Sequence, residues 1–234
     1  NAVAIRIARA ATGKDKVAMC GYHGWHDWYL SCNIASKQNL NSHLMTNLPI
    51  KGVPKNLKNT VFAFDYNNYK QLEKIVENNQ IGAIKMEVKR NEEPKKDFLK
   101  KVRKLADKKN IVLIFDECTS GFRQTLGGLH KYYKIDPDIA IFGKALGNGY
   151  AINAIIGKRP IMEATNKSFI SSTFWTERIG PTAAIETLKV MEELKSWQTI
   201  TENGKKIKKQ WQKLSNKFNL NIDIKGIDAI PNFS

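Results

Sequence analysis

Short apolar runs alternate with amphipathic segments along the first two-thirds of the chain. We expect strands at Lys16–Cys20, Thr60–Phe64, Gly82–Met86, Ile111–Phe115 and Ile139–Phe142. Helices are predicted where apolar residues recur with helical period, at residues 1–12, Tyr66–Glu77 and Pro94–Lys109. This order predicts βαβ units, and therefore an α/β fold whose mostly parallel sheet is covered by helices.

The last third of the chain is more helical. Two short strands, Ile152–Ile156 and Phe169–Ser172, flank a short helix at Pro160–Thr165. Two long helices and a strand-like run follow, at Ile179–Leu194, Ser196–Phe218 and Leu220–Ile224. We therefore predict a large domain over residues 1–178, and over 179–234 connecting helices that lead into a second domain.

Two regions fall outside this regular pattern. Residues 32–59 are polar and irregular, and a loop of that length is usually functional or mobile. The chain begins at Asn1 with a helical pattern already under way, so we expect it to be part of a longer protein. No apolar run approaches the ~20 residues that a membrane helix needs, which predicts no membrane partner.

Lysine and arginine outnumber aspartate and glutamate by 38 to 22, which gives a formal net charge of +16. Such a charge raises the question of nucleic-acid binding. The densest lysine groups, at residues 95–109 and 205–217, lie in helical patterns whose other face is apolar. We interpret them as solvated helix faces, so a non-catalytic basic binding module is a remote alternative and no nucleic-acid partner is expected.

The cysteines indicate a reducing environment. Cys20, Cys32 and Cys118 have no CxxC or histidine-partnered metal spacing. An odd number of cysteines in a chain of this size favours free thiols and a cytoplasmic location over a disulfide framework. We therefore predict no metal site.

Three chemically interesting side chains follow predicted strands where those strands end. They are Tyr22, Asp116 and Lys144, and Lys144 lies in a run that contains three glycines. Glycine permits sharp turns and close approach to a ligand, and lysine is rare at the end of a buried strand. Because parallel sheets bind ligands at the carboxyl ends of their strands, we expect these side chains to share one site.

The residues alone leave two interpretations of Asp116 and Lys144 open. A partly buried lysine attacks carbonyls well because burial disfavours its charged form. Lysine as Schiff base, aspartate on the ring nitrogen and an aromatic on the ring face is the arrangement of pyridoxal phosphate sites. Hydroxyls that suit the phosphate lie at Ser171, Ser172, Thr173 and Thr176. The alternative is a buried salt bridge between Asp116 and Lys144.

Four motifs lie in this region, and the two that contain Asp116 and Lys144 are highly specific when found together. The four are Ile-Phe-Asp-Glu-Cys-Thr-Ser-Gly-Phe-Arg at 114–123, Leu-Gly-Gly at 126–128, Asp-Pro-Asp at 136–138 and Gly-Lys-Ala-Leu-Gly-Asn-Gly at 143–149. With them, residues 2 to about 194 resemble the class III pyridoxal-phosphate-dependent aminotransferases, in particular the branch around glutamate-1-semialdehyde aminomutase. The resemblance implies a fold type I large domain that binds the cofactor over 1–178, followed by the start of a small C-terminal α/β domain.

On this resemblance, Lys144 and Asp116 are the catalytic pair. Lys144 is the Schiff-base lysine and carries the proton between substrate carbons. Asp116 keeps the pyridine nitrogen protonated, so that the ring acts as an electron sink. Tyr22 stacks on the ring from within a Tyr-His-Gly triplet, and His23 of that triplet belongs to the same cofactor site.

Two further positions carry over from the family. Glu87 matches the glutamate of a Glu-Pro pair near the cofactor, with Val88 in place of the proline. Thr173, within Ser-Thr-Phe-Trp-Thr, resembles the threonine that reaches the cofactor phosphate across a dimer interface. The resemblance therefore implies a homodimer that takes a small-molecule amino donor and a carbonyl acceptor.

Two departures bear on the reaction. After Thr173 the chain reads Phe-Trp-Thr-Glu-Arg-Ile-Gly-Pro, where many relatives have Ser-Gly-Asn-Pro. The triplet that starts at Tyr22 continues as Trp-His-Asp-Trp, where the aminomutase tends to have His-Ala-Asp. Both favour an aminotransferase that acts between two molecules, with the intramolecular aminomutase reaction as the alternative.

Overall fold

The computed structural model describes residues 1–234, and its centre is one six-stranded sheet in the order β2-β1-β3-β4-β5-β6. The strands are β1 Lys16–Cys20, β2 Val61–Ala63, β3 Ile81–Met86, β4 Val112–Asp116, β5 Ile139–Phe142 and β6 Ala154–Gly157. Strands β1 to β5 pair in parallel, and β6 is antiparallel to β5. The mostly parallel sheet confirms the predicted α/β fold.

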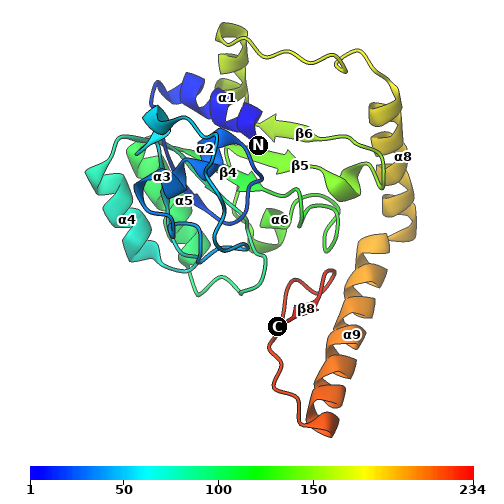
Figure 1. Cartoon of the computed structure of the whole chain (residues 1–234). Coiled ribbons are helices and arrows are strands. Elements are labelled where there is room, and N and C mark those ends of the chain that lie inside the picture. Colours follow the sequence, from blue (N-terminus) through cyan, green and yellow to red (C-terminus); the bar gives the residue numbers. More distant parts are fainter.

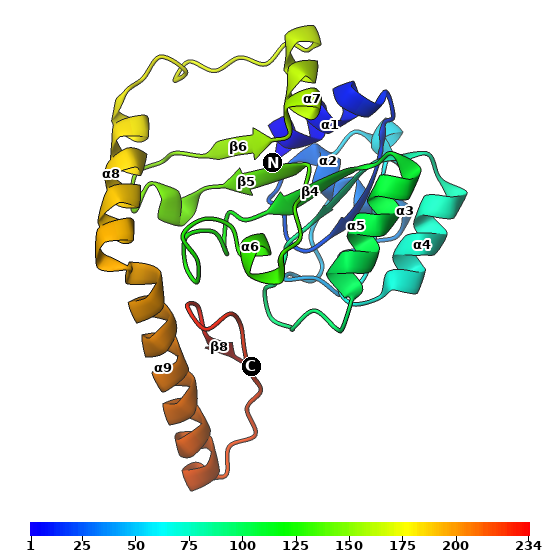
Figure 2. The ribbon, with the colours of Figure 1, turned by 180° about the vertical axis from the view of Figure 1, so that it is seen from behind.

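Helices cover both faces of this sheet (Figures 1 and 2). On one face, α4 (Tyr69–Asn78) and α5 (Phe98–Lys109) pack Leu72 and Val102 into a core with Ile84 and Phe115. On the other face, α1 (Ala2–Thr12) contributes Ile5 and Ala8 to a second core with Val17 and Ile114. Because both faces are covered, β3 and β4 are buried at every position.

The connections set the direction of the strands. Helix α4 links β2 to β3 and α5 links β3 to β4, so each crossover returns the chain to the same end of the sheet. The carboxyl ends of the parallel strands therefore meet along one edge. Shorter helices lie in the connections: α2 Asp27–Leu30, α3 Cys32–Ala35, η1 Lys55–Leu57, α6 His130–Tyr133, η2 Lys144–Leu146, α7 Arg159–Met162 and η3 Glu163–Lys167.

The last part of the chain forms an arm beside the sheet (Figures 1 and 2). It consists of α8 (Ile179–Leu194), α9 (Ser196–Phe218) and a hairpin of β7 (Ile224–Lys225) and β8 (Asn232–Phe233). Between the two short strands, Ile227 is buried in the same core cluster as α5. The chain thus returns to the α/β body after α9. None of the helices combines the length and the apolar composition that a membrane-spanning helix requires.

Some predicted boundaries are wrong. Residues Phe169–Ser172 form no strand, and the Phe169 side chain is 84% exposed, because no neighbouring strand lies beside them. Helix α4 begins at Tyr69 rather than Tyr66, since Asn68 accepts the N–H of Gln71 and caps the helix. Helix α5 begins after Asp97 instead of at Pro94, because Asp97 has a left-handed backbone.

Candidate active site

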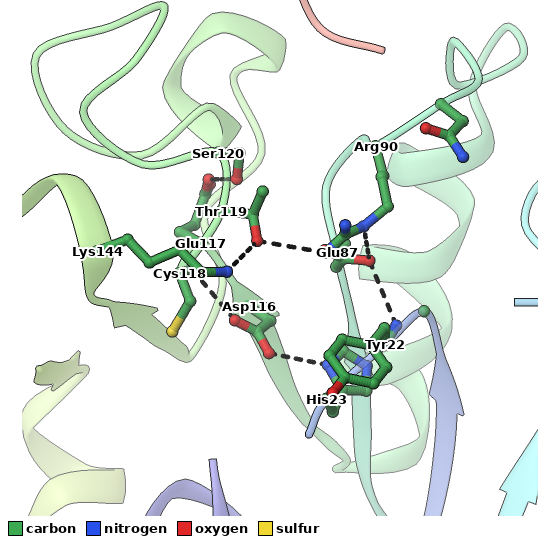
Figure 3. Close-up of polar contacts among 12 residues, drawn as sticks. Tyr22, His23, Glu87, Arg90, Asp116, Glu117, Cys118, Thr119, Ser120 and Lys144 are labelled. Carbon is green, nitrogen blue, oxygen red and sulfur yellow. Dashed lines mark hydrogen bonds and ion pairs between the residues drawn. The ribbon is translucent and has the colours of Figure 1, made fainter. Parts of the chain in front are cut away.

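Polar side chains from four strand ends converge at the carboxyl edge of the sheet (Figure 3). Asp116 ends β4, Glu87 follows β3, and Tyr22 and His23 follow β1 after one glycine. Lys144 begins η2 and is separated from the end of β5 by Gly143. The structure therefore brings together five of the six predicted site residues, and the sixth, Thr173, lies elsewhere in the chain.

Asp116 is the more buried of the two acidic residues at this site, and its side chain is 5% exposed. Its Oδ2 atom accepts from Lys85 Nζ at 2.9 Å and lies 2.8 Å from His23 Nδ1, while Oδ1 accepts the Cys118 N–H at 3.1 Å. Burial by itself raises the pKa of Asp116, but the charge of Lys85 and the contact with His23 outweigh it and hold that pKa well below its usual value. The carboxylate is thus ionised.

His23 lies behind this carboxylate and is fully buried. Its Nε2 atom lies 3.0 Å from the Cys20 carbonyl, and its ring stacks on Trp28. Burial and the nearby Lys85 charge lower the pKa of His23. We interpret His23 as a residue that orients Asp116.

The alternative of an Asp116–Lys144 salt bridge is wrong, because Asp116 pairs with Lys85 and His23. The sequence reasoning missed Lys85. A signal was available, since Lys85 is the only charged residue in a strand that is otherwise apolar. Its contact with β4 depends on strand register, in which Lys85 lies opposite Ile114.

Lys144 is more exposed than predicted. We expected a partly buried amine, but Lys144 is exposed because η2 carries it past the edge of the sheet, beside a cavity of about 1040 Å³. Its Nζ atom donates to Thr119 Oγ1 at 2.7 Å. The backbone φ of Lys144 is +47°, a strained conformation for a residue with a side chain. Such strain is common at functional sites.

In the turn after Lys144, Gly147 has no room for a side chain. A Cβ on Gly147 would lie 2.2 Å from the Tyr150 carbonyl oxygen, which is backbone and cannot move aside cheaply. The predicted role of this glycine in a sharp turn therefore has a steric cause.

Glu87 belongs to a hydrogen-bond network that ends at Lys144 (Figure 3). Arg90 Nε donates to both Glu87 oxygens at 2.9 and 2.8 Å, and its NH2 group donates to Thr119 Oγ1 at 3.2 Å. Thr119 is also the acceptor for Lys144, and the Tyr22 N–H donates to Glu87 at 3.4 Å. Sequence reasoning missed Arg90 and Thr119, which carried no strand-end signal.

Thr173 is exposed in the connection between η3 and α8, and none of its side-chain atoms forms a hydrogen bond within this chain. The neighbouring Ser171 and Ser172 line a cavity of about 790 Å³, together with Cys118 beside Asp116 and Asn1 at the start of α1. Two of the predicted phosphate hydroxyls thus lie on the α1 side of the site.

Solved structures with this fold include pyridoxal-phosphate proteins. The FumI protein of Sphingopyxis sp. MTA144, in its PLP internal aldimine form, superposes with a TM-score of 0.84 at 23% identity over 99% of this chain and 54% of that one. An omega-transaminase from Sphaerobacter thermophilus gives a TM-score of 0.81 at 22% identity over 97% and 55% of the two chains. The fold is that of the pyridoxal-phosphate-dependent transferases, as predicted.

The sequence defines the family within that fold. Residues 1–230 match the family described as Aminotransferase class-III, and the chain belongs to it. A 3-aminobutyryl-CoA aminotransferase from Cloacimonas acidaminovorans is 34% identical over 98% of this chain and 53% of its own length. A glutamate-1-semialdehyde 2,1-aminomutase from Archaeoglobus fulgidus is 34% identical over 81% and 46%. The chain spans about half the length of these relatives.

Proposed function

We propose that the protein containing this chain transfers amino groups by means of pyridoxal phosphate. The observation that carries the proposal is the placement of an ionised aspartate and an exposed lysine at the ends of neighbouring parallel strands in a class III aminotransferase chain. The substrates would be a small-molecule amino donor and a carbonyl acceptor.

The residues present fit this cofactor. Oδ1 of Asp116 has one backbone donor and can accept a further one, and its charge suits a protonated ring nitrogen. The Lys144 amine has a single hydroxyl partner that a carbonyl can replace. The start of α1 with Ser171 and Ser172 offers amides and hydroxyls for a phosphate.

When bound, pyridoxal phosphate supplies an electron sink for cleavage of a bond at the substrate amino carbon. In the proposal, Lys144 would hold the cofactor through its amine and would take up and return the proton on the substrate carbon that bears the amino group. Asp116, which His23 orients, would hold the ring nitrogen, and Tyr22 would cover the ring face. Glu87 positions the loop after β1, since it accepts the Tyr22 N–H.

We further propose a homodimer in which Thr173 reaches the phosphate of the partner's site. In support, the segment around Thr173 exposes large apolar side chains, with Phe174 at 73% and Trp175 at 65%. Such a patch is typical of a protein interface. The three free cysteines support a cytoplasmic location.

The test is to reduce the full-length protein with borohydride in the presence of pyridoxal phosphate and map the modified peptide by mass spectrometry. The pyridoxyl group is expected on Lys144 and is expected to disappear in Lys144→Ala. Lys167→Ala, which removes an exposed lysine from η3, is the matched control and should leave the labelling unchanged. Labelling that persists in Lys144→Ala would exclude the assignment.

A second candidate is the glutamate-1-semialdehyde aminomutase reaction, which the similarity to several glutamate-1-semialdehyde 2,1-aminomutases supports. The two reactions differ in their need for an amino donor. Turnover of glutamate-1-semialdehyde without any added donor would favour the aminomutase. Strict dependence on a donor would exclude it.

A further inference from the structure

Lys85 is a fully buried lysine whose side chain the proposed reaction does not use. It lies within β3, where its side chain is 0% exposed among apolar residues. A buried charge is costly unless it is paired. Lys85 is paired with Asp116, the residue that the proposed function places against the cofactor ring, with 2.9 Å between Nζ and Oδ2.

The two oxygens of Asp116 have different surroundings. Oδ2 faces Lys85 and His23, so protein groups already occupy it, while Oδ1 has only the Cys118 N–H. A ring nitrogen would therefore have Oδ1 as its acceptor. Lys85 and His23 together fix the carboxylate with this oxygen free.

The contact with Lys85 also affects how strongly the negative charge of Asp116 acts on a ring nitrogen. An aspartate that faces a ring nitrogen stabilises the proton there through its negative charge. Here Lys85 already compensates that charge from the protein side, and a further cation close by weakens the stabilisation. Other charged or titratable groups around the carboxylate are His23 after β1, Arg90 in the loop after β3 and Cys118 after β4.

We propose that Lys85 shares the Asp116 carboxylate with the ring nitrogen of the cofactor and so weakens the hold of that nitrogen on its proton. Lys85 is thus a positioning residue that tunes the electron demand of the ring. This inference rests on the proposed function for its ligand, but the contact between Lys85 and Asp116 is a property of the chain itself.

The first experiment needs no cofactor. In Lys85→Met, the His23 ring has two acceptors and no competing cation, so its protonation midpoint, followed by NMR of the imidazole nitrogens, should move up by about one pH unit or more. Lys16→Met is the control, because Lys16 starts the neighbouring strand and bonds Asn79 instead. An unchanged His23 midpoint would overturn the electrostatic role of Lys85.

The second experiment uses pyridoxal phosphate labelled with ¹⁵N in the ring. The midpoint for loss of the ring-nitrogen proton should rise by about one to two pH units in Lys85→Met relative to the wild type and Lys16→Met. If Lys85→Met does not fold, Lys85→Gln keeps a hydrogen-bond donor without the charge and should give the same shift.

The outcomes separate the two proposals. A pyridoxyl group on Lys144 with the same ring-nitrogen midpoint in all variants would overturn the inference and leave the proposed function intact. The absence of any adduct on Lys144 would overturn the proposed function, and this inference with it.

Discussion

Arg90 joins the Glu87 carboxylate to Thr119, the hydroxyl that holds Lys144. The Glu87 side chain is 8% exposed, so removal of its cation leaves a buried carboxylate without a charged partner. We expect Arg90→Ala to lower the free energy of unfolding by about 1–3 kcal/mol, measured by chemical denaturation.

A matched control for Arg90→Ala is Arg159→Ala. Arg159 pairs with Glu163 through a similar contact of 2.8 Å, but both side chains are exposed, at 89% and 56%. The control should cost less than about 0.5 kcal/mol. Equal effects of the two substitutions would show that burial does not strengthen the Glu87–Arg90 pair.

The carboxyl group of Asp138 is expected to make the stability of the folded protein depend on pH. Burial tends to raise its pKa, but Lys158, the Leu113 N–H and Arg103 together lower the pKa below its usual value. A carboxyl group with a lowered folded-state pKa stabilises the protein above its unfolded pKa of about 4, and this stabilisation is lost as the pH falls through the folded value.

Asp138→Asn is therefore expected to lower stability by about 1–3 kcal/mol at neutral pH and to make the decline towards about pH 3 shallower. The measurement is the denaturation midpoint across that range. Asp136→Asn, at an exposed site two residues earlier, is the control and should keep the slope of the wild type. A wild-type slope in Asp138→Asn would contradict the assignment of Asp138 as the titrating group.

Site residues could be predicted from the sequence where an apolar run marked the end of a strand. Asp116, Lys144 and Tyr22 follow apolar runs, so their meeting at one sheet edge followed from parallel topology. The partners of Asp116 were missed, because the contact with Lys85 depends on the register of β3 against β4. The exposure of Lys144 was missed because it depends on how η2 turns after β5.

At the level of elements, α9 packs on the C-terminal hairpin at Gly204, next to the contacts of Lys208 with Asp228 and of Trp211 with Phe233. A Cβ on Gly204 would lie 1.6 Å from the Asp228 carbonyl oxygen. Alanine favours a helix over glycine by about 1 kcal/mol, but here the clash outweighs that gain. We expect Gly204→Ala to displace residues 219–234 and to increase amide hydrogen exchange there while α5 stays protected.

The control for Gly204→Ala is Lys209→Ala on an exposed face of the same helix. It should leave hydrogen exchange in the hairpin unchanged. Exchange in Gly204→Ala equal to that of the wild type would show that the hairpin does not depend on this close approach.

The failure at Phe169–Ser172 shows where a pattern of apolar residues is ambiguous. An apolar run predicts burial, but it does not say whether a sheet neighbour or another molecule provides that burial. Phe169 is exposed in this chain, and so are Phe174 and Trp175 a few residues later. The same apolar run is therefore consistent with a strand and equally with a segment that packs on a partner.

For the whole molecule, the fold class followed from the order of strands and helices, since βαβ units admit few arrangements. The division at residue 178 stays a prediction. Figure 1 shows α8 and α9 as an arm beside the sheet, while Ile227 returns to the core that contains α5. Sequence pattern did not predict that return, because it depends on a contact between segments more than a hundred residues apart in the chain.

The proposed homodimer makes a prediction at this same scale. Trp175 is 65% exposed beside Thr173, and large aromatic side chains often dominate the binding energy of an interface. We expect the full-length protein to be a dimer by sedimentation, and Trp175→Asp to weaken the dimer by about 30-fold or more, equivalent to at least about 2 kcal/mol. Tyr132→Asp, at a site that is 72% exposed on α6, is the control and should leave the dimer intact.

If Thr173 serves the partner's site, Trp175→Asp should also lose pyridoxal phosphate affinity as it dissociates. A monomeric variant that keeps the affinity of the wild type would assign the phosphate to residues within one chain, where Ser171 and Ser172 already line the cavity beside Cys118.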